Sequence, residues 1–164
     1  KSIEEMIVWA ADSRKEFDTF GIGNFDRDIT IQLEKRDKGS YGVVYSTNSV
    51  EKGNVLHITN RSTESSSTMQ VTIAHEYMHH AQVKTQHDVV NGKNLMTESF
   101  NERRWISEGT AMWFEDHLYD ELDDYKSFIT PARIFEKGIS SEDNRYNNIT
   151  FWKLILNAQL KKPE

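Results

Sequence analysis

His75-Glu76-Tyr77-Met78-His79 is the stretch that decides the expected fold and chemistry, because it has the form H-E-x-x-H inside a segment of helical character. On an α-helix, histidines four residues apart lie about 40° apart around the axis, so both imidazoles can reach one metal ion. Glu76 would project beside that ion, where a bound water would sit. This geometry predicts a zinc site with its own general base. The competing interpretation is a chance pair of surface histidines on a solvated helix.

The composition indicates a soluble globular chain. Its 164 residues are 37% hydrophobic and 28% charged, which favours a single domain over residues 1–164 with one core. The formal charge of −6 argues against a nucleic-acid partner, because such proteins usually carry a basic surface. No segment has the roughly 20 apolar residues of a membrane span. The first residue is a lysine rather than a methionine, which is compatible with a fragment of a longer chain.

Hydrophobic periodicity predicts a helix, then strands, then further helices. Apolar residues recur at helical spacing over 2–20, 69–85, 101–122 and 147–160, and Pro131 is expected to open a short helix over 131–136 that ends before Gly138. Strands are expected over 29–33, 41–46 and 55–59, in an antiparallel or mixed sheet. The polar run 61–68 is expected to be a loop that ends in an N-cap at Ser66, Ser67 or Thr68. This order of elements indicates an α+β fold.

A catalytic zinc site needs a third protein ligand, and the absence of cysteine leaves histidine or a carboxylate. A third histidine six residues after His79 would have to stand at Thr85, so the longer H-E-x-x-H-x-x-G-x-x-H pattern fails. Glu108 is the better candidate, because it lies mid-helix among apolar residues. We expect the small Gly109 and Ala111 to let two helices approach closely enough for this carboxylate to reach the metal. The alternative is a solvated glutamate on a charged helix.

The two motifs together resemble a known family of enzymes. The residues H-E-Y-M-H at 75–79 and W-I-S-E-G-T-A at 105–111, with 28 residues between His79 and Glu108, are similar to the gluzincin zinc metallopeptidases. Within that family they are most similar to secreted bacterial peptidases of the collagenase-like and hyicolysin-like kinds. The similarity covers roughly residues 71–119, with a weaker echo at 146–154.

The resemblance implies a zincin-like metallopeptidase catalytic domain, in which a small sheet packs on an active-site helix and a glutamate helix. It implies His75, His79 and Glu108 as Zn²⁺ ligands, with Glu76 as general base and proton shuttle. It also implies a secreted or extracytoplasmic location and a strand that holds the substrate backbone by strand addition, for which we choose 55–59. One departure is Met112, which stands where collagenase-like members tend to have an acidic residue that supports a zinc histidine.

The oxyanion formed in such a reaction needs a donor in addition to zinc. The resemblance favours Tyr146, because such peptidases often use a tyrosine downstream of the third ligand. The alternative for Tyr146 is a structural tyrosine whose ring covers the core and whose hydroxyl contacts water. His117 and Tyr125 are further candidates for the donor.

Other polar residues near the motifs have ordinary explanations. Glu115 and Asp116 begin an acidic run that could replace the missing acid or bind calcium, but it lacks an ordered calcium loop, so a solvated helix end is expected. His80 is expected to be a surface residue. His57 is expected at the core edge or in a substrate cleft.

Together with the resemblance, these residues predict a zinc-dependent hydrolase of peptide bonds that acts on peptide or protein substrates. Zinc would lower the pKa of a bound water, and Glu76 would take its proton and pass it to the leaving amine. The aminopeptidase signature G-A-M-E-N is absent, which favours internal cleavage. Two other functions stay open. One is a non-catalytic binding or regulatory module that contains zinc, and the other is a zinc hydrolase of a non-peptide amide.

Overall fold

The computed structural model describes residues 3–20, 29–35, 41–43, 55–59, 65–89, 95–127, 138, 146 and 148–160. Internal contacts divide the chain into two units, Lys1–Glu98 and Ser99–Glu164. The described strands all belong to the first unit, and helices occur in both. The α+β class is therefore confirmed, with helix as the main component, while one domain over residues 1–164 stays a prediction.

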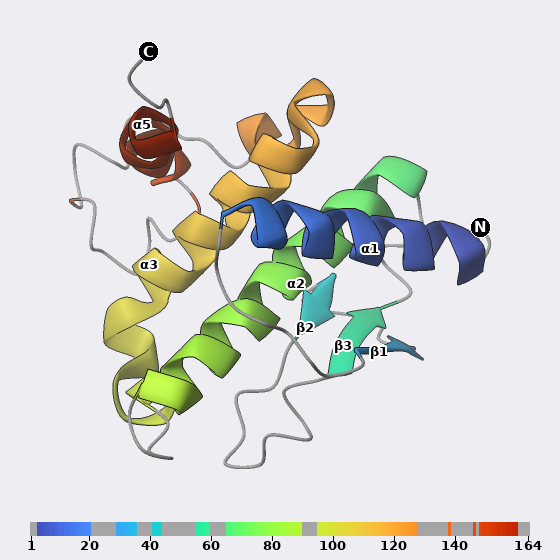
Figure 1. Cartoon of the computed structure of the whole chain (residues 1–164), viewed down its shortest axis with the longest axis horizontal. Helices are drawn as coiled ribbons and strands as arrows, with labels where there is room; N and C mark the ends of the chain where they lie inside the picture. Colours follow the sequence, from blue (N-terminus) through green and yellow to red (C-terminus); the bar gives the residue numbers. More distant parts are fainter. Residues whose placement is uncertain are drawn as a thin grey trace. The chain divides into compact units, whose positions relative to one another are not determined.

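The first unit combines two helices with a small sheet (Figure 1). Its elements are helix α1 (Ile3–Thr19), strands β1 (Thr30–Glu34), β2 (Gly42–Val43) and β3 (Val55–Thr59), and helix α2 (Ser66–Val89). Helix α2 contacts α1 and also strands β2 and β3. The helix expected over 69–85 is thus the middle of α2, and the sheet packs on it as expected.

The sheet is mixed, with β3 between β1 and β2. Strand β1 runs parallel to β3 with Thr30 opposite Val55, whereas β2 runs antiparallel to β3 with Gly42 opposite Ile58. The mixed form of the expected sheet is therefore confirmed, and an entirely antiparallel arrangement was wrong. Of the strand expected over 41–46, the structure has 42–43, and 44–46 lie outside the described residues.

The position of β3 corrects the choice of 55–59 as the strand that receives a substrate. Because β1 and β2 flank β3, its hydrogen-bonding groups already pair within the sheet. Strand addition needs an edge with unpaired backbone groups. Among the described strands, β2 is such an edge, and it lies beside α2.

Helix α1 is held against α2 by a buried aromatic contact. Phe17 and Tyr77 are both buried, and their rings stack with centroids 5.7 Å apart. Burial raises the pKa of Tyr77 to about 12. Ile3 and Ile7 are exposed although they follow the helical spacing, so the apolar periodicity overstates the buried face of α1.

Helix α2 begins earlier than expected because Ser65 caps it. The Ser65 Oγ accepts a hydrogen bond from the backbone N–H of Thr68 at 2.9 Å and donates one to Oγ1 of Thr68 at 2.6 Å. This is the arrangement of an N-cap residue with the third residue of its helix. The expectation of a cap at Ser66, Ser67 or Thr68 was therefore wrong, since all three lie within the helix.

The second unit contains most of helix α3 (Leu95–Leu118), the 3₁₀ helices η3 (Asp120–Leu122) and η4 (Asp124–Ser127), and helix α5 (Ile149–Leu160). The helix expected over 101–122 corresponds to α3 and η3, and the last expected helix corresponds to α5. The short helix expected over 131–136 lies outside the described residues, although Gly138 has a φ of 77°, which suits a helix end. None of the described helices is long and apolar enough to cross a membrane.

Helix α5 packs closely on α3 around Gly109. Asn148 donates a hydrogen bond from Nδ2 to the carbonyl of Trp105 at 2.7 Å, and Trp105 stacks on Trp152 with centroids 5.7 Å apart. A Cβ at Gly109 would overlap both Asn148 and Trp152. The nearest neighbours of Gly109 are thus Asn148, which precedes α5, and Trp152 on α5. The expectation that Gly109 and Ala111 let the two ligand-bearing helices approach closely stays a prediction.

An ion pair joins α3 and α5. Lys153 Nζ lies 2.6 Å from Oδ2 of Asp116 and 4.7 Å from the ring centroid of Tyr125. Burial raises the pKa of Asp116, and the hydrogen bond from Lys153 opposes that rise. Glu115 is buried as well, so the expected solvated helix end was wrong for these two acidic residues.

Candidate metal centre

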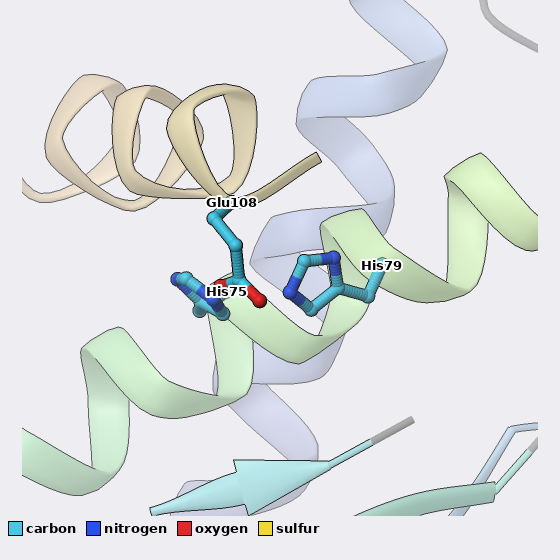
Figure 2. Close-up of side chains that lie close together, drawn as sticks. All are labelled: His75, His79 and Glu108. Carbon is cyan, nitrogen blue, oxygen red and sulfur yellow. The ribbon is translucent and has the colours of Figure 1, made fainter. Parts of the chain in front are cut away.

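His75 and His79 lie one turn apart on α2, and both are half-buried (Figure 2). Their ring centroids are 4.7 Å apart and their planes are inclined at 84°. The four-residue spacing puts both rings on one face of the helix. The structure therefore brings together the two imidazoles of the motif.

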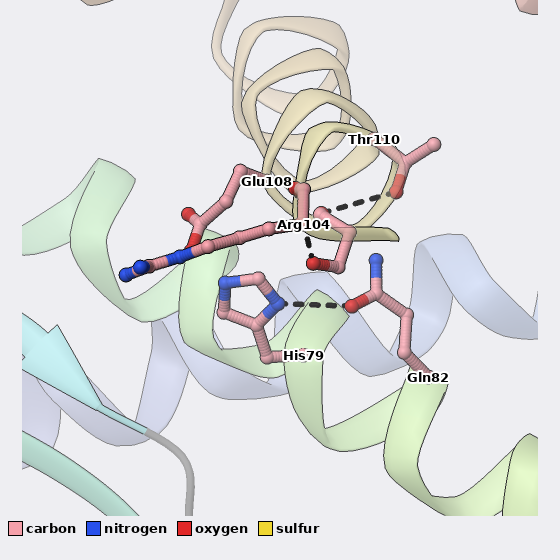
Figure 3. A network of polar contacts seen from close by, with 6 residues as sticks. His79, Gln82, Arg104, Glu108 and Thr110 are labelled. Carbon is pink, nitrogen blue, oxygen red and sulfur yellow. Dashed lines mark hydrogen bonds and ion pairs between the residues drawn. The ribbon is translucent and has the colours of Figure 1, made fainter. Parts of the chain in front are cut away.

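Gln82 orients the ring of His79. Its Oε1 lies 2.9 Å from Nδ1 of His79 (Figure 3). Because an amide oxygen can only accept, Nδ1 carries the proton, and Nε2 keeps a lone pair for a metal. Metal-binding histidines commonly have such a partner on the nitrogen that does not face the metal. Gln82 is thus placed to favour the tautomer of His79 in which Nε2 can bind a metal.

Glu76 is buried and lies against strand β2. Only 5% of this residue is exposed. A Cβ placed on Gly42 would stand 2.5 Å from Cγ and 2.7 Å from Oε1 of Glu76, so the glutamate occupies space that only a glycine leaves. The Glu76 side chain, which belongs to helix α2, therefore lies directly against the edge strand β2.

Glu108 is the acidic member of the candidate site and lies on α3. It is 7% exposed. Arg104 precedes it by one helical turn on the same helix, and Nε of Arg104 lies 3.5 Å from Oε1 of Glu108 (Figure 3). The buried carboxylate therefore has a cation beside it within α3.

One nitrogen from each of His75 and His79 and one oxygen of Glu108 all lie within 4.8 Å of one another (Figure 2). This group could hold a metal ion. Around a tetrahedral ion with bonds of about 2.0–2.2 Å, donor atoms lie about 3.4 Å apart. The upper limit of 4.8 Å on the separations in this group is compatible with such a set of donor atoms.

Tyr146 is half-buried in a turn just before α5, and its proposed role as the oxyanion donor stays a prediction. The two other candidates have different contacts. His117 stacks on Trp113 with centroids 5.1 Å apart, and Tyr125 lies beneath Lys153. Met112 is buried on α3.

The sequence also predicted positions for His80 and His57. His80 was expected at the surface, but it is buried and lies edge-on to Tyr77, with centroids 5.9 Å apart. His57 is half-buried on β3, as expected for the core edge, and its Nδ1 pairs with Oε1 of Glu34 on β1.

Comparisons of the chain with protein-family models, with curated proteins and with solved structures gave no significant match. The residues and their geometry are therefore the basis for a function.

Three residues of the site were not found by sequence reasoning. Gln82 and Arg104 stand three residues after His79 and four before Glu108, and these spacings place side chains together on a helix. The spacing alone could therefore have identified Gln82 and Arg104 as neighbours of the proposed ligands. Spacing could not have identified Gly42, because its contact with Glu76 depends on the order of strands in the sheet.

Proposed function

We propose that this chain is the catalytic domain of a zinc-dependent peptidase of the gluzincin type. The observation that carries the proposal is the separation of the donor atoms of His75, His79 and Glu108, which all lie within 4.8 Å of one another. A surface histidine pair and a solvated glutamate would not be expected to converge in this way. The resemblance of the two motifs to gluzincins points to the same three residues.

The donor set supports zinc as the metal. Two imidazole nitrogens and one carboxylate oxygen are the three protein ligands found in many catalytic zinc sites, which keep a fourth position open for water or substrate. The chain has no cysteine, so the closed thiolate sites that zinc uses structurally are excluded. Imidazole-rich sites also bind other divalent metals, and zinc is favoured by its preference for four-coordinate geometry.

Glu76 is the proposed general base. Bound zinc would supply a Lewis acid and lower the pKa of the attacking water. Glu76 would accept the proton of that water and deliver it to the leaving amine. Its burial against Gly42 supports this role, because a carboxylate held in one place transfers protons over a short and constant distance. Tyr146 stays the proposed donor to the oxyanion.

A peptide is the proposed substrate, bound along the edge strand β2. Backbone hydrogen bonds to a strand edge recognise extended peptides of almost any sequence. Gly42 belongs to this edge and lies against Glu76, so a peptide paired with β2 would pass close to the base. Cleavage within a chain and a secreted or extracytoplasmic location are further parts of the proposal. The first rests on the absence of the G-A-M-E-N signature from the sequence, and the second rests on the resemblance to secreted peptidases alone.

The replacement Glu76→Gln tests the proposed function, with Glu4→Gln on the exposed side of α1 as a matched control. Zinc content would be measured by elemental analysis, and cleavage of an unfolded protein substrate by mass spectrometry. We expect Glu76→Gln to keep one zinc per chain and to lose about 10²–10⁴-fold in turnover. The control should match the parent chain.

Two results would count against the peptidase. Unchanged turnover in Glu76→Gln would refute the assigned base. If the parent chain binds zinc but cleaves no peptide under any metal condition, a non-catalytic zinc module or a hydrolase of a non-peptide amide becomes the better account. Addition of a chelator, followed by restoration of zinc, separates metal-dependent cleavage from a contaminating protease.

A further inference from the structure

The contact between Arg104 and Glu108 has no part in the proposed chemistry, yet it involves a proposed metal ligand. Nε of Arg104 lies 3.5 Å from Oε1 of Glu108, and the side chain of Arg104 is 29% exposed whereas that of Glu108 is 9% exposed. Both residues belong to α3, one turn apart, so the helix itself brings them together.

A buried carboxylate is costly unless an opposite charge lies beside it. Arginine is suited to this task because its guanidinium stays protonated at every physiological pH and is less strongly hydrated than an ammonium group. In the metal-free chain, Arg104 therefore supplies positive charge to Glu108. A divalent metal ion bound to the same carboxylate would supply more positive charge than Arg104 does.

The two cations act against each other. A guanidinium next to Oε1 withdraws electron density from the carboxylate and repels a dication that approaches it. The guanidinium also stabilises the metal-free state of the chain. An interaction that stabilises the metal-free state relative to the metal-bound state weakens metal binding by the same free energy. The usual partners of metal ligands differ in this respect, since a carboxylate or carbonyl partner strengthens the ligand.

We propose that Arg104 is the resident counter-ion of Glu108, and that metal loading exchanges the interaction with this guanidinium for one with the metal. The inference rests on the metal site proposed above. Arg104 thereby keeps the metal-free chain stable and sets the metal affinity below the value that the three ligands alone would give.

The replacement Arg104→Met tests the proposal, because methionine keeps much of the apolar stem and removes the charge. Zinc affinity would be measured by competition with a chromophoric chelator, and the unfolding temperature would be measured in EDTA and in excess zinc. We expect zinc to bind about tenfold more tightly to Arg104→Met. We also expect a lower unfolding temperature in EDTA and a much smaller decrease in zinc.

Two further variants serve as controls. Arg104→Lys keeps a point charge at the same place, so it should remain close to the parent chain in both measurements. Lys126→Met removes the same charge from η4, where the side chain is 61% exposed, and should change neither the zinc affinity nor the zinc dependence of unfolding. If Arg104→Met does not fold in EDTA but folds in zinc, the proposal is supported, since metal then replaces the lost charge.

Equal or weaker zinc binding by Arg104→Met would overturn the proposal, and so would an equal loss of unfolding temperature with and without zinc. Equal losses of unfolding temperature would mean that Arg104 stabilises the fold through packing alone. The metal site is tested separately, by zinc binding to the parent chain and its loss in His79→Ala. A parent chain that binds zinc without cleaving peptides would refute the peptidase while leaving the role of Arg104 standing.

Discussion

Glu76 fills the space beside Gly42 so closely that a methyl group on the glycine would stand 2.5 Å from Cγ of the glutamate. The contact joins the first turn of the H-E-x-x-H segment to the edge strand of the sheet. It involves two residues that are 34 positions apart in the sequence and belong to one unit of the fold. The proposed base is therefore positioned by a strand as well as by its own helix.

The replacement Gly42→Ala should reduce turnover while leaving zinc in place. The added methyl group would displace Glu76, and an error of about 1 Å in a catalytic group can cost on the order of 100-fold in rate. Zinc content, turnover and unfolding temperature would be measured together. Gly138→Ala is the matched control, because nothing lies within 4 Å of its Cβ position and its φ of 77° makes the substitution strained. It should lower stability without affecting turnover, and equal turnover in the two variants would contradict the role of Gly42.

Gln82 should control zinc affinity through His79. Gln82→Leu removes the acceptor on Nδ1, so we expect zinc binding to weaken by about 10-fold or more. Gln82→Glu keeps an acceptor at the same place, and a carboxylate strengthens the ligand, so its affinity should equal or exceed that of the parent chain. Chelator competition would measure both variants. Identical affinities for the leucine and glutamate variants would show that the hydrogen bond does not orient the ligand.

Gly109→Ala should destabilise the packing of α5 on α3. The added methyl group would overlap Asn148 and Trp152, and overpacking of this kind typically costs about 1–3 kcal/mol. The free energy of unfolding would be measured by denaturant titration. The fluorescence of Trp152, which stacks on Trp105, should change as well. Unaltered stability would mean that α5 can shift to accommodate the methyl group.

Tyr77 should make the stability of the chain fall at high pH. Burial raises its pKa from 10.0 to about 12, so the folded chain keeps the proton above the pH at which the unfolded chain releases it. The contribution is complete below pH 10 and is lost as pH rises towards 12, and it amounts to about 2–3 kcal/mol. The stability of Tyr77→Phe should not show this decrease at high pH. Unfolding free energies of both chains from pH 9 to 12 would test it, and parallel curves would contradict it.

Local patterns were sufficient for most of the elements and for the relation between His75 and His79. Helical spacing follows from 3.6 residues per turn, so the approach of two residues four apart does not depend on tertiary structure. The α+β class likewise followed from the order of periodic segments. Strand β3 was found over 55–59, and α5 began two residues after the expected position.

Features that depend on tertiary structure were harder to predict. The order of strands places β3 in the centre, and no local pattern distinguishes a central strand of five residues from an edge strand of the same length. His80 and Asp116 are buried although their residue types favour the surface, and each lies beside a specific neighbour, Tyr77 and Lys153 respectively. The cap at Ser65 was missed because four consecutive cap-forming residues follow one another.

An anomalous difference map at the zinc absorption edge, from crystals of the parent chain grown with zinc, is the most direct test of the proposed zinc site. We expect one strong peak bonded to a nitrogen of His75, a nitrogen of His79 and an oxygen of Glu108, at about 2.0–2.2 Å from each. A peak held by the two histidines while Glu108 lies too far away to share the ion would contradict it, as would a folded chain with no peak at this group.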